Sequence, residues 1–373
     1  TSLCGGSCIP TVNDATHCGG CAPCPTIPNA TSVCTASVCS FVCNRGFIRE
    51  GSVCMPCGAV GQRVCESGVC IPGLSACGGI CRDTSGDRNH CGSCGRVCQT
   101  GFPCGDGACV VPRSCTDSTS LCGITAVSGG TFDLGDVSGQ GVNALPVQRM
   151  VTVGPIYADT YEVTVGRFRV YWSAGHPAPG TVAYPSGLYG FAGTVAEPGS
   201  GVGCTWRGSS VDAPINCVNW STAQAFCAWD GGRLPTEAEW EGLARGTGSY
   251  PWGSSGPEDR LVCWSGSTLR STACPVGSAP LGATETGLMD MAGGVYEWTA
   301  DSFQPYSYSG CWGTSTGRVN PLCGQLSGGT TTRTVRGGSW ETTVAANLRV
   351  GSRISRAMTT SERGTGFRCV RSR

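Results

Sequence analysis

The chain has 373 residues, and its 25 Lys and Arg residues are balanced by 25 Asp and Glu residues. Charged residues make up only 13% of the sequence, which argues against a basic surface for nucleic acid or anionic lipid. The length allows two or more domains, and no apolar run is long enough to span a membrane.

Cysteines are numerous and unevenly distributed. Positions 4–122 hold 21 of the 29 cysteines and positions 204–369 hold the other eight. This change in composition predicts a domain boundary between Cys122 and Gly129. Cytosolic thiols stay reduced, whereas exported proteins use cysteines as disulfides. We therefore expect a secreted, extracellular or cell-surface protein whose cysteines are almost fully oxidised.

One pattern of eight cysteines occurs twice in the first third of the chain. The steps between cysteines are 4, 10, 3, 3, 10, 5 and 4 in the first copy and 4, 10, 3, 4, 6, 5 and 6 in the second. A shared phase over eight cysteines indicates an internal repeat. We expect cysteine-rich modules at 1–58 and 77–122, joined by a cysteine-containing link at 59–76. The two copies are Cys4, Cys8, Cys18, Cys21, Cys24, Cys34, Cys39, Cys43 and Cys77, Cys81, Cys91, Cys94, Cys98, Cys104, Cys109, Cys115.

These modules contain few large apolar residues, so cross-links are expected to stabilise them. The repeats resemble cysteine-rich modules of secreted bacterial proteins, notably myxobacterial ones. We expect local disulfides confined within each module, without assigning their connectivity. Zinc or an iron–sulfur cluster is the alternative, because the spacing at Cys18–Cys24 and Cys91–Cys98, with His17 and His90 adjacent, is similar to that of zinc sites.

Three helix starts are predicted after residue 129. Thr164 is a candidate N-cap before apolar residues at helical spacing, and Gly175 would end that helix. Capping boxes are predicted at Ser221 with Gln224 and at Thr236 with Glu239.

Residues 129–373 carry a series of motifs. They are, in order, Gly129–Gly135, Thr160–Thr164, Pro214–Trp220, Gly232–Glu241, Tyr250–Gly253, Leu288–Trp298, Arg336–Thr342 and Gly366–Cys369. This series resembles the formylglycine-generating-enzyme (sulfatase-modifying factor) family. The resemblance implies an α+β fold, an irregular C-type-lectin-like domain with two or three short helices, small antiparallel sheets and long loops.

The resemblance also implies a copper-binding cysteine pair, which this chain lacks. The matching positions hold Thr342 and Asn347. A soft metal such as Cu(I) prefers thiolates to a hydroxyl or an amide. The family's pocket serine matches Ser339, and Tyr296 stands where a Trp is usual. We therefore expect no copper and no enzymatic activity. The three histidines of the chain, the third being His176, are too scattered for an iron site or a Ser-His-Asp site.

Calcium is the one cofactor that the resemblance suggests for this chain. The family ligands match Asp290, Gly293, Val295 and Glu297, a combination of two carboxylates and two main-chain carbonyls that suits a hard cation. A hydrogen-bonded acidic turn without a metal is the alternative. A second family site falls near Leu261–Val262, where no acidic or amide side chain is found.

The resemblance pairs Cys227 with Cys369. The other six late cysteines pair most economically as neighbours, giving Cys204–Cys217, Cys263–Cys274 and Cys311–Cys323. The odd cysteine then belongs to the N-terminal region. Cys122 is the best candidate because it lies outside both repeats, and a bond to another chain would make the protein a multimer.

The leading functional hypothesis is a secreted, non-catalytic binding or structural protein. Its lectin-like domain would bind a glycan or another extracellular protein, or the chain would associate with itself in an extracellular filament or coat. The alternative is a divergent formylglycine-generating-type oxidoreductase that acts on an exported protein.

Overall fold

The computed structural model divides into two compact units, Thr1–Val110 and Val111–Arg373. It describes the chain except residues 1, 5, 6, 10, 67, 116–120, 137, 146, 313–316 and 325–330, and at 7–9 it describes the backbone alone. None of the helices in the described ranges is long and apolar enough to cross a membrane.

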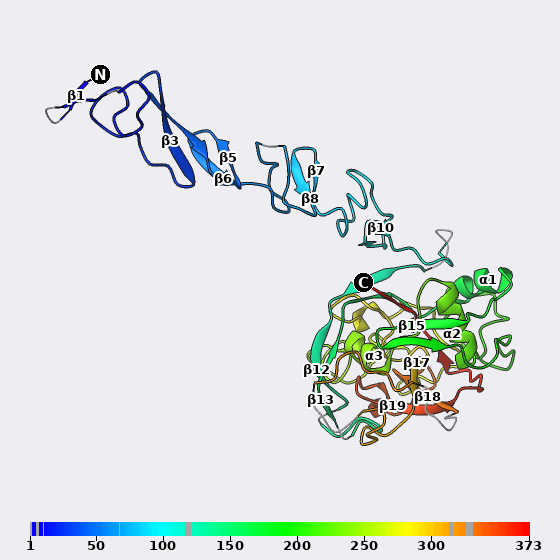
Figure 1. Ribbon diagram of the computed structural model, residues 1–373. Coiled ribbons are helices and arrows are strands. Elements are labelled where there is room, and N and C mark those ends of the chain that lie inside the picture. The colour runs from blue at the N-terminus through cyan, green and yellow to red at the C-terminus, as the bar shows by residue number, and fades with distance from the viewer. Residues whose placement is uncertain are drawn as a thin grey trace. The chain divides into compact units, whose positions relative to one another are not determined.

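The first unit is a series of short antiparallel hairpins (Figure 1). Its buried side chains are mainly half-cystines, as the low apolar content predicted. His17 and His90 lie in turns, where His17 contacts Asp14 at 3.0 Å and His90 accepts a hydrogen bond from the Gly95 amide. The strands are β1 (Ser2–Cys4), β2 (Ser7–Ile9), β3 (Ala30–Thr35), β4 (Val38–Cys43), β5 (Phe47–Glu50), β6 (Val53–Pro56), β7 (Ser75–Cys77), β8 (Ile80–Arg82), β9 (Cys104–Gly105) and β10 (Ala108–Cys109).

Disulfide pairing follows the repeat. Equivalent cysteines form equivalent bonds in the two copies, which supports the prediction that the modules are duplicates. The bonds are Cys4–Cys21, Cys18–Cys34 and Cys24–Cys39 in the first copy, and Cys77–Cys94, Cys91–Cys104 and Cys98–Cys109 in the second. In each copy two disulfides lie close together, so that three sulfur atoms come within 4.8 Å of one another. Two of the three are bonded to each other, as Cys24 is to Cys39 and Cys98 is to Cys109.

Two expectations about the cysteines are wrong. Cys122 bonds Cys115, seven residues away, with the two Cα atoms 5.8 Å apart, which is within normal disulfide reach. Pairing is also not confined to the modules, because Cys57–Cys65 and Cys70–Cys81 join the link to its neighbours. Cys43 bonds Cys54. Every cysteine except Cys8, whose side chain is not described, is then in one of the fourteen bonds.

In its described residues, the second unit combines three helices with small sheets. Strands β11, β14 and β21 form one sheet, β19-β18-β17-β20 another, and β12–β13 and β15–β16 are hairpins. The helices are α1 (Val165–Ser173), α2 (Trp220–Trp229) and α3 (Glu237–Ala244), with 3₁₀ turns η1 (Pro280–Gly282) and η2 (Ala345–Leu348). The strands are β11 (Ile124–Val127), β12 (Gly130–Leu134), β13 (Gln148–Val153), β14 (Ile156–Asp159), β15 (Thr181–Tyr184), β16 (Gly187–Gly190), β17 (Tyr296–Ser302), β18 (Thr332–Arg336), β19 (Arg353–Ala357), β20 (Thr365–Gly366) and β21 (Val370–Ser372).

Two of the three predicted helix starts are confirmed. Thr164 caps α1, and Thr236 and Glu239 form a complete capping box at α3. The third is wrong, because Asn219 caps α2 by accepting a hydrogen bond from the Thr222 amide. The hydroxyl of Ser221 instead donates to the Ala192 carbonyl.

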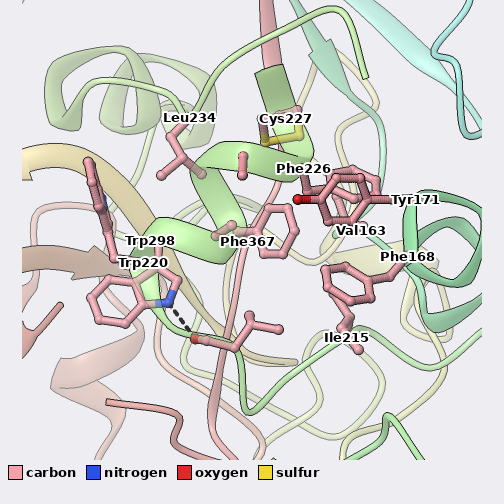
Figure 2. Packing of buried hydrophobic residues seen from close by; sticks show 14 of the residues in the cluster. Val163, Phe168, Tyr171, Ile215, Trp220, Phe226, Cys227, Leu234, Trp298 and Phe367 are labelled. Atoms are coloured by element: carbon pink, nitrogen blue, oxygen red, sulfur yellow. Dashed lines mark hydrogen bonds between the residues drawn. A yellow bond between two sulfur atoms is a disulfide. The ribbon is translucent and has the colours of Figure 1, made fainter. Parts of the chain in front are cut away.

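The main core of the second unit lies between α1, α2 and the strand β17 (Figure 2). Phe168, Phe226 and Phe367 are fully buried there. Trp298 is also buried, and its indole N–H donates to the Val218 carbonyl at 3.0 Å. All seven residues of β17 are buried, so this strand gives rigid support to the turn that precedes it.

All four disulfides predicted for the second unit are confirmed. They are Cys204–Cys217, Cys227–Cys369, Cys263–Cys274 and Cys311–Cys323. Cys227–Cys369 spans 142 residues and connects α2 to the segment before β21. The other three close short loops of 11 to 13 residues.

Candidate functional site

The two positions that replace the cysteine pair meet around one glycine. Gly338 has a positive φ of 79° after β18, and a Cβ atom there would lie 3.4 Å from Thr342 Oγ1 and 3.3 Å from the Asn347 carbonyl. The same Cβ would come within 2.6 Å of Leu348, so a glycine is required. The fold therefore brings the Thr342 hydroxyl and the main-chain carbonyl of Asn347 to the same glycine.

The Thr342 hydroxyl is held by its own turn. It accepts a hydrogen bond from the Ser339 amide at 2.9 Å, and the Thr342 amide donates to the Ser339 carbonyl at 2.9 Å. Ser339 Oγ in turn accepts from the Glu341 amide. These bonds fix the hydroxyl groups of Ser339 and Thr342 in a buried turn, where neither has a histidine beside it to act as a base.

Tyr296 completes this small polar cluster. Burial raises the pKa of Tyr296, and a hydrogen bond with Thr342 partly opposes that shift. The Arg356 guanidinium lies 5.2 Å from the centre of the Tyr296 ring. We call Tyr296, Ser339, Thr342 and Asn347 the replaced pocket. Its residues are those that the resemblance identified, and they are polar and lack a thiol.

The rim of the replaced pocket is charged. Arg356 pairs with Glu362, and Arg363 pairs with Glu341 at 2.7 Å. The side chains of Glu362 and Arg363 are about half exposed. A surface with both signs of charge can recognise a partner of complementary charge pattern.

The turn predicted to hold calcium lies next to the replaced pocket. Asp290, Gly293 and Gly294 all have positive φ angles. The Gly293 amide donates to the Gly337 carbonyl, and the Trp340 amide donates to the Gly294 carbonyl. The turn and the segment after β18 therefore hold one another in place.

Glu297 is already engaged by other side chains. Arg368 donates to both of its carboxylate oxygens at 2.6 to 2.8 Å, and the Trp240 indole N–H donates at 2.7 Å. Arg368 also donates to the Met289 carbonyl. Glu297 thus neutralises a buried guanidinium, a role that its position in the motif did not reveal.

Glu162 is the residue that the sequence analysis missed. It is fully buried, and its Oε1 accepts a hydrogen bond from the Val295 amide at 2.7 Å. A Cβ on Gly294 would lie only 2.5 Å from Oε1, so Glu162 occupies the space beside this turn. Burial, and then repulsion from Asp290 and Glu297, raises the pKa of Glu162 well above its usual value. Burial also raises the pKa of Asp290 to about 6.

Two buried carboxylates, Glu162 and Glu297, and the partly buried Asp290 therefore lie near one guanidinium, that of Arg368. This excess of negative charge is suited to a hard cation. Asp290 and Glu162 are better placed as ligands than Glu297, although Asp290 Oδ2 already accepts from the Gly277 amide. Among the described residues, these carboxylates are not close enough to form a group of three metal-ligating atoms. Calcium at this turn remains a proposal. Near Leu261–Val262 the disulfide Cys263–Cys274 closes the loop.

We expect calcium to raise the thermal stability of the wild-type protein and a chelator to lower it. A ligand at about 100 times its Kd adds about 2.7 kcal/mol to the unfolding free energy. Calorimetry with and without calcium measures this, and D290N should lose most of the effect. E341Q, which changes a carboxylate outside the turn, should keep it. Equal melting temperatures of the wild type in both buffers would contradict the proposal.

A second buried acid predicts a pH dependence of stability. Asp301 accepts hydrogen bonds from the amides of Glu237 and Cys323 at 2.6 and 2.7 Å. Burial, and then repulsion from Glu237, raises the pKa of Asp301 from 3.8 to about 7. The folded state therefore holds this proton more tightly than the unfolded state. Its contribution to stability is complete below the unfolded pKa and is lost as the pH rises through the folded pKa.

We expect the unfolding free energy of the wild type to fall relative to D301N between about pH 4 and pH 7, by up to about 1.4 kcal/mol per pH unit. Urea titrations across this range measure the difference. D259N, which changes a partly exposed acid, should leave the slope unchanged. A wild-type slope parallel to that of D301N would show that Asp301 does not titrate in this range.

Comparison with known proteins identifies the family that the motifs resemble. The FGE-sulfatase family model, described as the sulfatase-modifying factor enzyme 1-like domain, matches residues 112–373. The formylglycine-generating enzyme of Thermomonospora curvata is 32% identical over 296 residues, covering 66% of this chain and 93% of that protein. The inactive C-alpha-formylglycine-generating enzyme 2 of Mus musculus is 34% identical over 191 residues, covering 48% and 53%.

The structure of PvdO from Pseudomonas aeruginosa is similar in fold, with a TM-score of 0.50, 23% identity, and coverage of 67% of this chain and 94% of that one. The α+β, C-type-lectin-like fold implied by the resemblance is confirmed. Because the relatives include both an enzyme and a protein named as inactive, the family alone does not decide catalysis. On the family match and the shared fold, the chain belongs to the FGE-sulfatase family of sulfatase-modifying factor enzyme 1-like domains.

Proposed function

We propose that this protein is a secreted, non-catalytic binding or structural protein. The observation that carries the proposal is the replaced pocket, in which Thr342 and Asn347 meet around Gly338 without a thiol. A hydroxyl and an amide are poor ligands for Cu(I). Without that metal, the serine and the tyrosine of the pocket have no means of activating oxygen.

The cysteine chemistry supports an extracellular location. Fourteen disulfides cross-link the described part of the chain, and such a load is typical of proteins that fold in an oxidising compartment. The cysteine-rich modules contain little apolar core, so they depend on these bonds. Reduction of the disulfides would disrupt the first unit in particular.

The partner is an extracellular protein or a glycan, or a second copy of this chain. The charged rim formed by Arg356, Glu362, Glu341 and Arg363 offers a surface on which loops of a lectin-like domain could recognise such a partner. Duplicated modules and a formal net charge of zero favour self-association into a filament or coat. Light scattering, non-reducing electrophoresis and electron microscopy of native material distinguish self-association from binding by a monomer.

The test of the non-catalytic proposal is copper binding together with aldehyde formation on a cysteine-containing peptide. We expect the wild type to bind no Cu(I) tightly and to give no aldehyde. T342C/N347C should gain tight Cu(I) binding, because it puts a thiolate at both positions that match the family's cysteine pair.

The matched control is T343C/N347C, since Thr343 is exposed whereas Thr342 is buried. It should bind Cu(I) much more weakly. Aldehyde formation by the wild type with added copper would overturn the proposal and support the alternative, a divergent oxidoreductase acting on an exported protein.

A further inference from the structure

A small cavity lies between the hairpin β15–β16 and helix α2. It has a volume of about 20 Å³ and is walled by Tyr184, Tyr189, Trp220, Gln224, Ala300 and Arg333, among others. A cavity above about 10–15 Å³ can hold one water-sized species. It is separate from the replaced pocket and from the acidic turn, because it shares no residue with either.

One residue that lines the cavity, Arg333, is a buried arginine that has no acidic partner in the described part of the chain. Its side chain is only 2% exposed, and no carboxylate of the described residues lies within salt-bridge distance of it. The neighbouring residues 325–330, which are outside the described part, include no acid in the sequence. Every other fully buried arginine of the second unit has an acidic partner, such as Glu237 for Arg353 and Glu297 for Arg368.

The Arg333 guanidinium is only partly satisfied. Its Nη1 donates to the Ala300 carbonyl and to Ser302 Oγ, and the ring of Trp220 lies 4.1 Å from the guanidinium carbon. Its Nε has no acceptor. Burial lowers the pKa of Arg333, and Asp301 and Tyr184 oppose this shift from a distance. A buried cation without a counter-charge is strongly unfavourable.

Gln224 supplies a second unpartnered polar atom in the cavity wall. Its Nε2 lies 3.3 Å from Tyr184 Oη, and its Oε1 is buried without a partner. The two ends of an amide are interchangeable in shape. With the amide turned over, Tyr184 Oη would donate to Oε1 and the NH₂ group would become the unpartnered atom. Arg333 and Gln224 would then both offer N–H donors.

We propose that this cavity is a binding site for a small monovalent anion of about the size of a halide, held by Arg333 and Gln224. The anion supplies a counter-ion in direct contact with Arg333, where no described carboxylate lies within salt-bridge distance. The cavity has room for about one water-sized species, which matches a halide rather than a larger anion. The site does not depend on the non-catalytic function proposed above.

Solution stability tests the proposal on the full-length chain. Unfolding is followed by calorimetry in sodium chloride and in sodium gluconate at equal ionic strength, since gluconate is too large for the cavity. Above its Kd, each tenfold rise in chloride should lower the unfolding equilibrium constant about tenfold. R333M should lose this dependence. R260M, which changes an exposed arginine paired with Glu258, should keep it.

Anomalous diffraction from wild-type crystals grown in bromide tests the site without any substitution. A bromine peak between Arg333 and Gln224, together with the chloride dependence in solution, is the expected result. Density for a water molecule without an anomalous peak would overturn the proposal. So would equal stability of the wild type in chloride and gluconate, or a chloride dependence in R333M equal to that of the wild type.

Discussion

Removing the Cys227–Cys369 disulfide should cost more stability than removing any other disulfide of the second unit. The bond spans 142 residues, and cross-linking a loop of that length contributes about 5 kcal/mol in the chain-entropy description. Both sulfur atoms are in fully buried residues, so C227A/C369A also leaves a cavity. Urea unfolding of C227A/C369A against the wild type measures the loss.

The matched control for this prediction is C311A/C323A, which opens a loop of 12 residues. The same description gives it about 3 kcal/mol. A loss in C311A/C323A as large as in C227A/C369A would mean that loop length does not set the contribution of these bonds.

The second large effect is expected from R167M, because Arg167 is the centre of a buried ion network. Its Nη1 and Nη2 atoms lie 2.9 Å from Asp159 and 2.7 Å from Asp230. Arg371 bridges the same two acids at 2.7 and 2.8 Å. Burial alone would raise the pKa of Asp159, and the two arginines more than offset it. R167M leaves two buried carboxylates with one arginine.

Breaking a buried pair in this way costs about 3–5 kcal/mol, measured as the difference in unfolding free energy. R207M, which removes the exposed pair of Arg207 with Glu197, should cost no more than about 1 kcal/mol. R167M/D230N should lose less than the sum of its single variants, because each change relieves the imbalance left by the other. Additive losses would show that Arg167 acts through packing alone.

Local signals in the sequence predicted local structure well. The capping box at Thr236 and Glu239 is formed by atoms within four residues, so its spacing was sufficient to identify it. The predicted capping box at Ser221 was wrong because Asn219, two residues earlier, is also a good N-cap. What decides between them is the Ser221 bond to Ala192, 29 residues away. A contact between residues so far apart in the sequence cannot be predicted from the spacing of residues within the motif.

In the candidate site, too, local sequence signals were predictive and long-range contacts were not. The sequence identified Thr342 and Asn347 from their place in a motif, and the fold brings the Thr342 hydroxyl and the Asn347 carbonyl to the same glycine. It did not identify Glu162, because the bond from Glu162 to Val295 joins residues 133 apart. It also assigned Glu297 to a metal without Arg368, which lies 71 residues away. The one available signal was an acid within the otherwise uncharged motif at Thr160–Thr164.

The overlapping disulfides of the first unit have a mechanical consequence. Each bond there spans only 8 to 17 residues, and several interlock, as Cys4–Cys21 does with Cys18–Cys34. A pulling force between Cys4 and Cys109 would pass from one sulfur bridge to the next, with only short stretches of free backbone between them. Under tension the unit would lengthen little before a covalent bond carried the load. It would therefore act as a nearly inextensible tether in an oxidising medium and would become extensible on reduction.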